Sequence, residues 1–177
     1  IHLFGHSQQS DTKILKIINE KEGSTIFYDN IKNWHLKYLN STQAMNAIAT
    51  ISVIKELNLN LETSLKIISN VKPLSGRGEK LTINFKGNNK TLIIDDSYNA
   101  NPDSMKAALN NFLIKKTMFN KYETILIIGD MLELGKYSTK MHLDLIPLIK
   151  KIHPNLLITL GKYSNIIANE LKSTLNC

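Results

Sequence analysis

Apolar and polar residues follow two patterns along the chain, one typical of strands and one typical of helices. In the carboxyl-terminal half, three short apolar runs predict buried strands, at residues 91–94, 123–128 and 156–160. Apolar residues at helical spacing follow these runs and predict helices, at residues 102–115, 139–152 and 165–171. Strands that alternate with helices predict an α/β domain with a parallel sheet and right-handed crossovers.

The amino-terminal half combines shorter strands with two helices. Strand-like runs occur between turns rich in Gly and Asn, at residues 1–4, 25–28 and 34–39. Residues 10–18 are interpreted as a helical turn, and residues 1–40 offer no catalytic constellation. An Ala- and Ile-rich stretch predicts a helix over 42–57, and Asn60 is the expected N-cap of a second helix over 61–69.

A loop with two glycines follows the second helix. Residues 74–79 read Leu-Ser-Gly-Arg-Gly-Glu, and we place a domain boundary just before them, which gives predicted domains of 1–73 and 74–177. The loop is either an ordinary interdomain connection or a phosphate site. In a phosphate site, the glycines let the backbone approach and Arg77 supplies a bidentate charge.

The stretch 91–105 places polar residues between the end of a strand and the start of a helix. Its strand ends in Asp95 and Asp96, and Asn101 is the expected N-cap of a helix that starts at Pro102. Ligands of α/β sheets bind at the carboxyl ends of strands, which makes the intervening turn a candidate site. The alternative is a turn and a capped helix with no ligand, because turn chemistry alone produces such motifs.

Turns and strand ends predict how these segments are arranged. Residues 81–86 and 91–94 flank Gly87-Asn88-Asn89, which predicts a β-hairpin. The carboxyl ends of parallel strands meet at one edge of a sheet. We therefore expect a cleft formed by the residues that follow three strands, namely Asp96, 129–130 and 161–162.

Composition narrows the classes of function. The net charge is +7, but the lysines are dispersed and Arg77 is the only arginine, so we expect no nucleic-acid partner. The one cysteine, Cys177, excludes a disulfide framework, and the five histidines lack zinc-ligand spacing. No apolar run approaches the ~20 residues of a membrane span. We expect a cytoplasmic monomer with no metal site and no membrane partner. We also expect the chain to be part of a longer protein, because Ile1 already lies in a strand-like run.

Several motifs together resemble the Mur ligase family of ATP-dependent ligases. DDSYNANPDSM at 95–105 resembles the start of the carboxyl-terminal domain, and GRGE at 76–79 its arginine-bearing hinge. GDMLELG at 129–135 is similar to a signature of the members that add D-alanyl-D-alanine. Asn46-Ala47 resembles the end of a His-Asn-x-x-Asn-Ala pattern near the adenine, although Thr42 and Gln43 stand where the His and the first Asn would be.

This resemblance implies a fold and a reaction. Residues 1–73 would be the tail of an ATP-binding central domain, and residues 74–177 a Rossmann-like carboxyl-terminal domain. ATP would activate the carboxylate of UDP-N-acetylmuramoyl-tripeptide, and the amine of D-alanyl-D-alanine would then attack it, in peptidoglycan precursor synthesis. No P-loop occurs in the 177 residues, so the main residues for ATP and Mg²⁺ are expected upstream, and the chain alone is expected to be inactive.

The resemblance also implies roles for individual residues. Arg77 would stabilise phosphate charge, Asp96 would accept hydrogen bonds from the ribose or orient the hinge, and Asn46 would contact the adenine. The turn would receive the dipeptide through four side chains, those of Ser97, Tyr98, Asn99 and Asn101. Two other functions stay open: another Mur-type or folylpolyglutamate-type ligase of the same fold, and a non-catalytic ligand-binding remnant.

Overall fold

The computed structural model describes residues 1–29, 31–84 and 90–177. In it the chain forms two compact units, Ile1–Asp95 and Asp96–Cys177. Within the described ranges, no helix is both long enough and apolar enough to cross a membrane. The α/β class is confirmed, because strands and helices combine in each unit and parallel pairing occurs in both.

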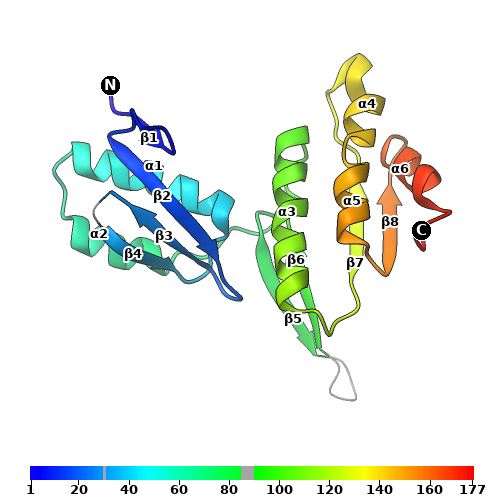
Figure 1. The fold of residues 1–177 in the computed structure, drawn as a ribbon, viewed down its shortest axis with the longest axis horizontal. Helices are drawn as coiled ribbons and strands as arrows, with labels where there is room; N and C mark the ends of the chain where they lie inside the picture. The colour runs from blue at the N-terminus through cyan, green and yellow to red at the C-terminus, as the bar shows by residue number, and fades with distance from the viewer. Residues whose placement is uncertain (30, 85–89) are drawn as a thin grey trace. The chain divides into compact units, whose positions relative to one another are not determined.

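A sheet with two packed helices makes up most of the first unit (Figure 1). Its strands lie in the order β1 (Phe4–Gly5), β2 (Thr12–Asn19), β3 (Ser24–Tyr28) and β4 (Ile31–Leu36). β1 and β2 are parallel, and the other neighbours are antiparallel. The helices are α1 (Ser41–Glu56) and α2 (Leu61–Ser69), which confirms both predicted helices and the N-cap at Asn60.

Apolar side chains between the sheet and the helices form the core of this unit. Ile26 of β3 is fully buried in one cluster with Ile48 and Ile51 of α1. Trp34 of β4 is buried in the same cluster, and its Nε1 donates a 2.8 Å hydrogen bond to Ser69 Oγ at the end of α2. The indole therefore satisfies its donor while it packs, as a buried tryptophan requires.

The expected helical turn over residues 10–18 is wrong, because residues 12–18 belong to β2. Thr12 and Ile14 are buried and Lys13 between them is half-buried, which is the two-residue period of a strand. The register against β3 shifts between Ile14 and Lys16. Such an irregularity interrupts the alternation of buried and exposed positions, and so the strand is hidden from a simple pattern.

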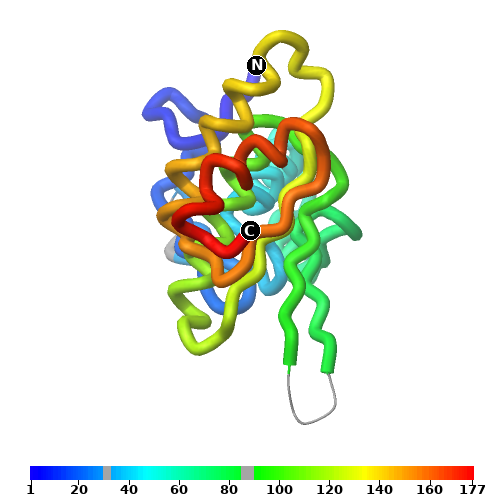
Figure 2. The backbone as a smooth tube through the Cα atoms, turned by 90° about the vertical axis from the view of Figure 1, so that its right-hand side faces the viewer, coloured from blue at the N-terminus to red at the C-terminus, as the bar shows by residue number. Residues whose placement is uncertain are grey.

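The predicted β-hairpin completes the first unit. β5 (Glu79–Asn84) and β6 (Lys90–Asp95) are antiparallel, and Figure 2 shows the two strands side by side. Their pairing runs from Glu79 opposite Asp95 to Asn84 opposite Lys90. The predicted turn, Gly87-Asn88-Asn89, lies outside the described residues.

Two parallel strands and several helices form the second unit. The strands are β7 (Ile125–Gly129) and β8 (Leu156–Leu160). The helical segments are α3 (Pro102–Met118), the 3₁₀ turn η1 (Gly135–Tyr137), α4 (Ser138–Leu143), α5 (Ile146–Ile152) and α6 (Ser164–Leu171). Leu126 and Ile128 of β7 are buried in a cluster with Leu109 of α3. Met105 and Phe112 pack beside Leu109, as the helical spacing predicts.

The single helix expected over residues 139–152 is broken into two. α4 ends at Leu143, and α5 starts at Ile146. Pro147 has no N–H to donate to the carbonyl of Leu143, so the hydrogen-bond ladder cannot continue through this point. Proline is well suited to the first turn of the new helix.

The expected three-stranded parallel sheet needs a correction. Among the described residues, β7 pairs with β8 in parallel, whereas β6 pairs with β5 as a hairpin. An apolar run identifies a strand but not its neighbour, and pairing with the previous strand closes a much shorter loop. The placement of Asp96 at one edge with residues 129–130 and 161–162 therefore stays a prediction, and so does the domain boundary between residues 73 and 74.

Candidate functional site

The loop that carries Arg77 is attached to the start of α1. Gly76 and Gly78 are buried, with φ values of +72° and +82° that glycine adopts without strain, and Arg77 between them is exposed. The Gly78 N–H donates to the carbonyl of Asp95 at 2.8 Å. The side chain of Gln43 donates from Nε2 to the carbonyl of Arg77. The main chain of this loop is therefore held on two sides.

Gln43 and Asn46 lie about one turn apart on α1. The Asn40 side chain caps the helix by accepting hydrogen bonds from the N–H groups of Thr42 and Gln43, each at 3.0 Å. In return, Gln43 Oε1 accepts from the Asn40 N–H at 2.9 Å. Residues three apart on a helix are neighbours, so the exposed Asn46 lies on the side of α1 that holds the Arg77 loop.

The predicted dipeptide loop opens the second unit and leads into α3. Its first four residues are exposed, namely Asp96, Ser97, Tyr98 and Asn99. Asn101 caps α3 as predicted, because its Oδ1 accepts from the N–H groups of Asp103 at 3.1 Å and Ser104 at 2.9 Å. The Oδ1 of Asn101 is therefore used by the helix cap.

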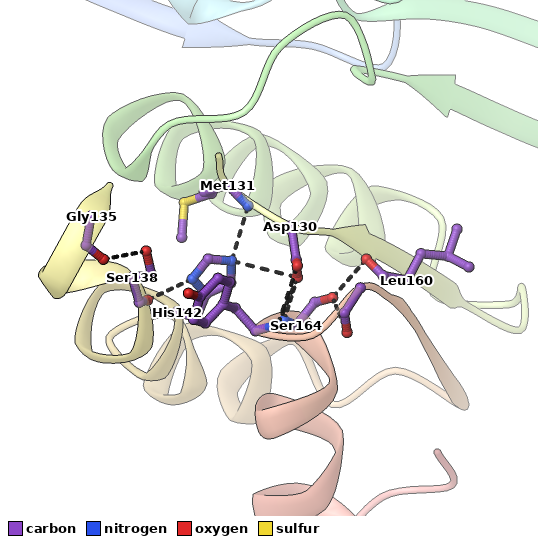
Figure 3. Close-up of polar contacts among 9 residues, drawn as sticks. Asp130, Met131, Gly135, Ser138, His142, Leu160 and Ser164 are labelled. Carbon is purple, nitrogen blue, oxygen red and sulfur yellow. Dashed lines mark hydrogen bonds and ion pairs between the residues drawn. The ribbon is translucent and has the colours of Figure 1, made fainter. Parts of the chain in front are cut away.

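A second polar centre lies at the carboxyl ends of β7 and β8 (Figure 3). The carboxylate of Asp130, just after β7, accepts hydrogen bonds from the N–H groups of Tyr163 at 3.0 Å and Ser164 at 2.6 Å. It thus caps α6, where a negative charge also interacts well with the helix dipole. Gly161 makes room for it, because a Cβ there would lie 2.3–2.5 Å from the carboxyl atoms of Asp130.

His142 of α4 joins this centre and is fully buried. Its Nδ1 lies 2.7 Å from the carbonyl oxygen of Ser138 and therefore carries the proton, whereas Nε2 accepts from the Met131 N–H at 2.9 Å. The ring is the neutral Nδ1–H tautomer, with Nε2 3.9 Å from Asp130 Oδ1. The imidazole therefore holds the main chain of the GDMLELG segment.

Asp130, His142 and Ser164 are the residue types of a serine nucleophile site, but their geometry excludes that chemistry. Ser164 Oγ donates to the carbonyl of Leu160 at 2.8 Å instead of to the imidazole. Ser164 and His142 are both fully buried. A nucleophilic serine needs a hydrogen bond to its base and access to substrate. The hydrogen bonds of this centre instead join the ends of β7 and β8 to the start of α6.

The hydrogen bonds at Asp130 stabilise its charged form. Burial alone raises the pKa of this carboxyl group, but the hydrogen bonds from Ser164 and Tyr163 outweigh it, so the pKa lies below the ordinary value. In the unfolded chain, the carboxyl group of an Asp has a pKa of about 3.9. The charged carboxylate therefore stabilises the unit above that pH, and this contribution is lost as the pH falls through the folded-state pKa.

Replacement of Asp130 by asparagine is expected to lower the free energy of unfolding of the second unit by about 1–3 kcal/mol at neutral pH, because an amide removes the charged acceptor at the start of α6. The difference from the wild type should shrink as the pH falls below about 4. Urea unfolding at several pH values, followed by circular dichroism, measures this. A difference that is independent of pH would contradict the assigned role of the carboxylate.

Comparison with known families decides the affiliation. The sequence profile described as "Mur ligase, glutamate ligase domain" matches residues 76–176, which is more than half of the chain. The chain belongs to the Mur ligase family. The resemblance read from its motifs is thereby confirmed.

Individual relatives match almost the whole of this Mur ligase chain. The UDP-N-acetylmuramoyl-tripeptide–D-alanyl-D-alanine ligase of Rickettsia prowazekii is 29% identical over 179 residues, which cover 99% of this chain and 38% of the relative. Crystal structure II of MurF from Acinetobacter baumannii has a TM-score of 0.75 at 22% identity. This match covers 98% of this chain and 36% of the Acinetobacter baumannii chain. MurF from Thermotoga maritima, in complex with ADP, has a TM-score of 0.64 at 20% identity. This match covers 98% of this chain and 42% of the Thermotoga maritima chain. The chain therefore spans less than half the length of these relatives, and the two structures show the likeness of fold.

The structure brings together some of the predicted site residues and adds others. Arg77 and Asn46 lie at the same part of the first unit, connected through Gln43. The ligand roles of these residues and of the 96–101 loop stay predictions. Sequence reasoning missed the joint role of Asp130 and His142, for which the available signals were Asp130 after one strand and Gly161 after the next.

Proposed function

We propose that this Mur ligase chain is the carboxyl-terminal part of an ATP-dependent ligase that joins D-alanyl-D-alanine to UDP-N-acetylmuramoyl-tripeptide. The observation that carries the proposal is the match to the Rickettsia prowazekii ligase of that name across 99% of the chain. The GDMLELG motif supports the same amine substrate. Because the matched stretch is 38% of that relative, the activity is proposed for a protein that includes the rest of such a ligase.

The proposed reaction has two steps. ATP transfers its γ-phosphoryl group to the tripeptide carboxylate, which gives an acyl phosphate and ADP. The dipeptide amine attacks the acyl carbon, the C–N bond forms, the C–O bond to phosphate breaks, and the amine proton passes to solvent. Such a reaction requires stabilisation of charge on the transferring phosphoryl group and a tightly oriented amine.

Three residues of this chain would serve the nucleotide. Arg77 would stabilise phosphate charge, and its exposure between two glycines supports close approach to a phosphate. Asn46 would contact the adenine, and its exposed position on the same side of α1 supports this role. Asp96 would accept hydrogen bonds from the ribose hydroxyls or orient the hinge. The ADP bound to the Thermotoga maritima relative supports ATP as the co-substrate.

The 97–101 loop would receive the dipeptide. Its exposed side chains offer hydroxyl and amide groups, namely Ser97, Tyr98, Asn99 and Asn101. These groups can accept hydrogen bonds from an ammonium group or donate them to a carboxylate, the two ends of a dipeptide. The loop precedes the amino terminus of α3, whose dipole favours the negatively charged end of the ligand.

Other features of the proposal concern the whole ligase. Mg²⁺ would assist phosphoryl transfer, but the described residues contain no group of three or more His, Cys, Asp or Glu side chains that could hold a metal. The main residues that hold Mg²⁺ are proposed to lie in the rest of the ligase. We further propose a cytoplasmic monomer that acts in cell wall biogenesis, and hence in cell shape and division, with its carboxyl-terminal domain starting at residue 74.

The proposal is tested with a full-length ligase that contains this chain. Purified enzyme with ATP and UDP-N-acetylmuramoyl-tripeptide should release phosphate when D-alanyl-D-alanine is added, and mass spectrometry should detect the extended peptide. Neither glutamate nor any other single amino acid should replace the dipeptide. Activity with one of these and not with D-alanyl-D-alanine would show a different Mur-type or folylpolyglutamate-type ligase.

The 177-residue chain by itself is expected to release no phosphate from ATP when both substrates are present. Its sequence has no Gly-Lys-Ser/Thr P-loop to surround the β- and γ-phosphates. A phosphate-release assay on the purified chain, with the full-length ligase as a positive control, measures this. Turnover by the chain alone would show that it contains a complete ATP site.

A further inference from the structure

The carboxamide of Gln43 makes hydrogen bonds through both its oxygen and its nitrogen. Only the bond to the oxygen belongs to the cap of the helix on which Gln43 lies. Oε1 accepts from the Asn40 N–H at 2.9 Å, which is the return bond of the capping box of α1. Nε2 donates to the main-chain carbonyl of Arg77, 34 positions away in the sequence. A glutamine whose role was to cap the helix would need the first contact alone.

The Arg77 loop is fitted closely around this amide. Gly78 is buried with a φ of +82°, and a Cβ on it would lie 3.1 Å from Gln43 Nε2 and 3.3 Å from Asn40 Nδ2. The Arg77 N–H donates to the carbonyl of Leu74 at 3.0 Å, and the Gly78 N–H donates to that of Asp95 at 2.8 Å. The Arg77 carbonyl is thus fixed from the side of α1, and the Gly78 N–H from the side of β6.

We propose that Gln43 is a positioning residue, which fixes the main chain of Arg77 on α1 so that the guanidinium is held ready for the nucleotide phosphates. The proposal rests on the proposed function, because the role of Arg77 in ligation is proposed there. If the loop were free, its main chain would have to be ordered during the reaction, at a cost in conformational entropy. In a loop that is already fixed, the main chain of the arginine has lost this conformational freedom before the substrates bind. The interaction acts in the transition state, so we expect kcat to depend on Gln43 more than KM does.

Two variants of the full-length ligase separate the positioning contact from the helix cap. In Gln43→Glu, a carboxylate still accepts from the Asn40 N–H and suits the first turn of a helix, but no donor is left for the Arg77 carbonyl. Gln43→Met removes both contacts at similar side-chain length and adds no charge. Both variants are expected to lower kcat about tenfold or more, with a smaller change in KM.

Asn40→Ala is the matched control. It removes the side chain that caps α1 and lies near Gly78, but it leaves the Gln43 amide and its bond to the Arg77 carbonyl. It is therefore expected to lower the thermal stability while kcat stays within about twofold of the wild type. Hydrogen exchange at the Arg77 and Gly78 amides should accelerate in both Gln43 variants and not in Asn40→Ala. In an Arg77→Ala background, Gln43→Met should lower kcat no further, because the two residues act as one unit.

Three results would overturn the proposal. These are wild-type kcat in both Gln43 variants, an equal loss of kcat in Asn40→Ala, and additive losses in the Arg77→Ala background. If the wild-type ligase itself had no ligation activity, the proposed function would fail, and the kinetic role of Gln43 would fail with it. The exchange measurement would still decide whether Gln43 holds the loop.

Discussion

Replacement of Arg77 by alanine is expected to lower kcat of the full-length ligase by about 10²–10³-fold. A preorganised cation beside a transferring phosphoryl group stabilises charge that develops in the transition state, and removal of one such group has effects of this size. Arg77 is exposed, so the free energy of unfolding should change by about 0.5 kcal/mol or less. Steady-state ligation with all three substrates, and urea unfolding of the same preparations, measure the two effects.

Three further variants sharpen this experiment. Arg77→Lys keeps the charge but loses the planar fork, so its kcat should lie between those of the wild type and Arg77→Ala. Arg77→Ala combined with Asp96→Ala should abolish ligation and leave the fold intact. Lys66→Ala is the control, since Lys66 is an exposed cation of the first unit that pairs with Glu62 on α2. Normal ligation by the Arg77/Asp96 double variant would remove both residues from the site.

Replacement of Gly161 by alanine is expected to destabilise the second unit by about 3 kcal/mol or more, the largest effect on stability that we predict. Gly161 has a φ of +120°, which residues with a side chain rarely adopt. The new Cβ would also lie 2.3 Å from Asp130 Cγ, on a carboxylate that the N–H groups of Tyr163 and Ser164 hold in place. Either the strand end or the start of α6 must move.

A second glycine variant and an internal fluorescence reference test whether overlap with Asp130 causes this loss of stability. Gly135 has a φ of +54°, and a Cβ added to it would meet no atom within 4 Å, so Gly135→Ala should lose only about 1–2 kcal/mol. In an Asp130→Ala background the overlap is removed, and Gly161→Ala should then be less destabilising than in the wild type. Trp34 is the only tryptophan and lies in the first unit, so its fluorescence serves as a reference for the circular dichroism of the whole chain. Equal losses in the two glycine variants would contradict the overlap with Asp130.

Local sequence signals predicted most of the fold. The N-caps Asn60 and Asn101 lie where their side chains accept hydrogen bonds from the first helical turn. The apolar runs predicted β7 and β8, and helical spacing predicted the buried face of α3. Two predictions failed where a local irregularity interrupts the pattern, at the register shift in β2 and at the Pro147 break between α4 and α5.

The candidate site was predicted less completely. The motifs identified Arg77, Asn46 and the 96–101 loop as candidates, and their ligand roles await the experiments above. Neither the donor bond from Gln43 to Arg77 nor the cap that Asp130 provides for α6 was predicted. In the sequence, Gln43 is only a departure from a family pattern. Its partner is a main-chain carbonyl, and no side-chain motif records such a contact.

The sequence by itself determined the family, the local elements and the helix caps, since these depend on motifs and on interactions among residues a few positions apart. Only the tertiary structure decided that β6 pairs with β5 and that Gln43 holds the Arg77 loop. It also decided that Asp130 caps α6 beside a neutral His142. The Gln43 and Asp130 contacts both join residues 34 positions apart. Such contacts form only when packing of the core brings distant segments together, and the side chains that make them carry no local pattern.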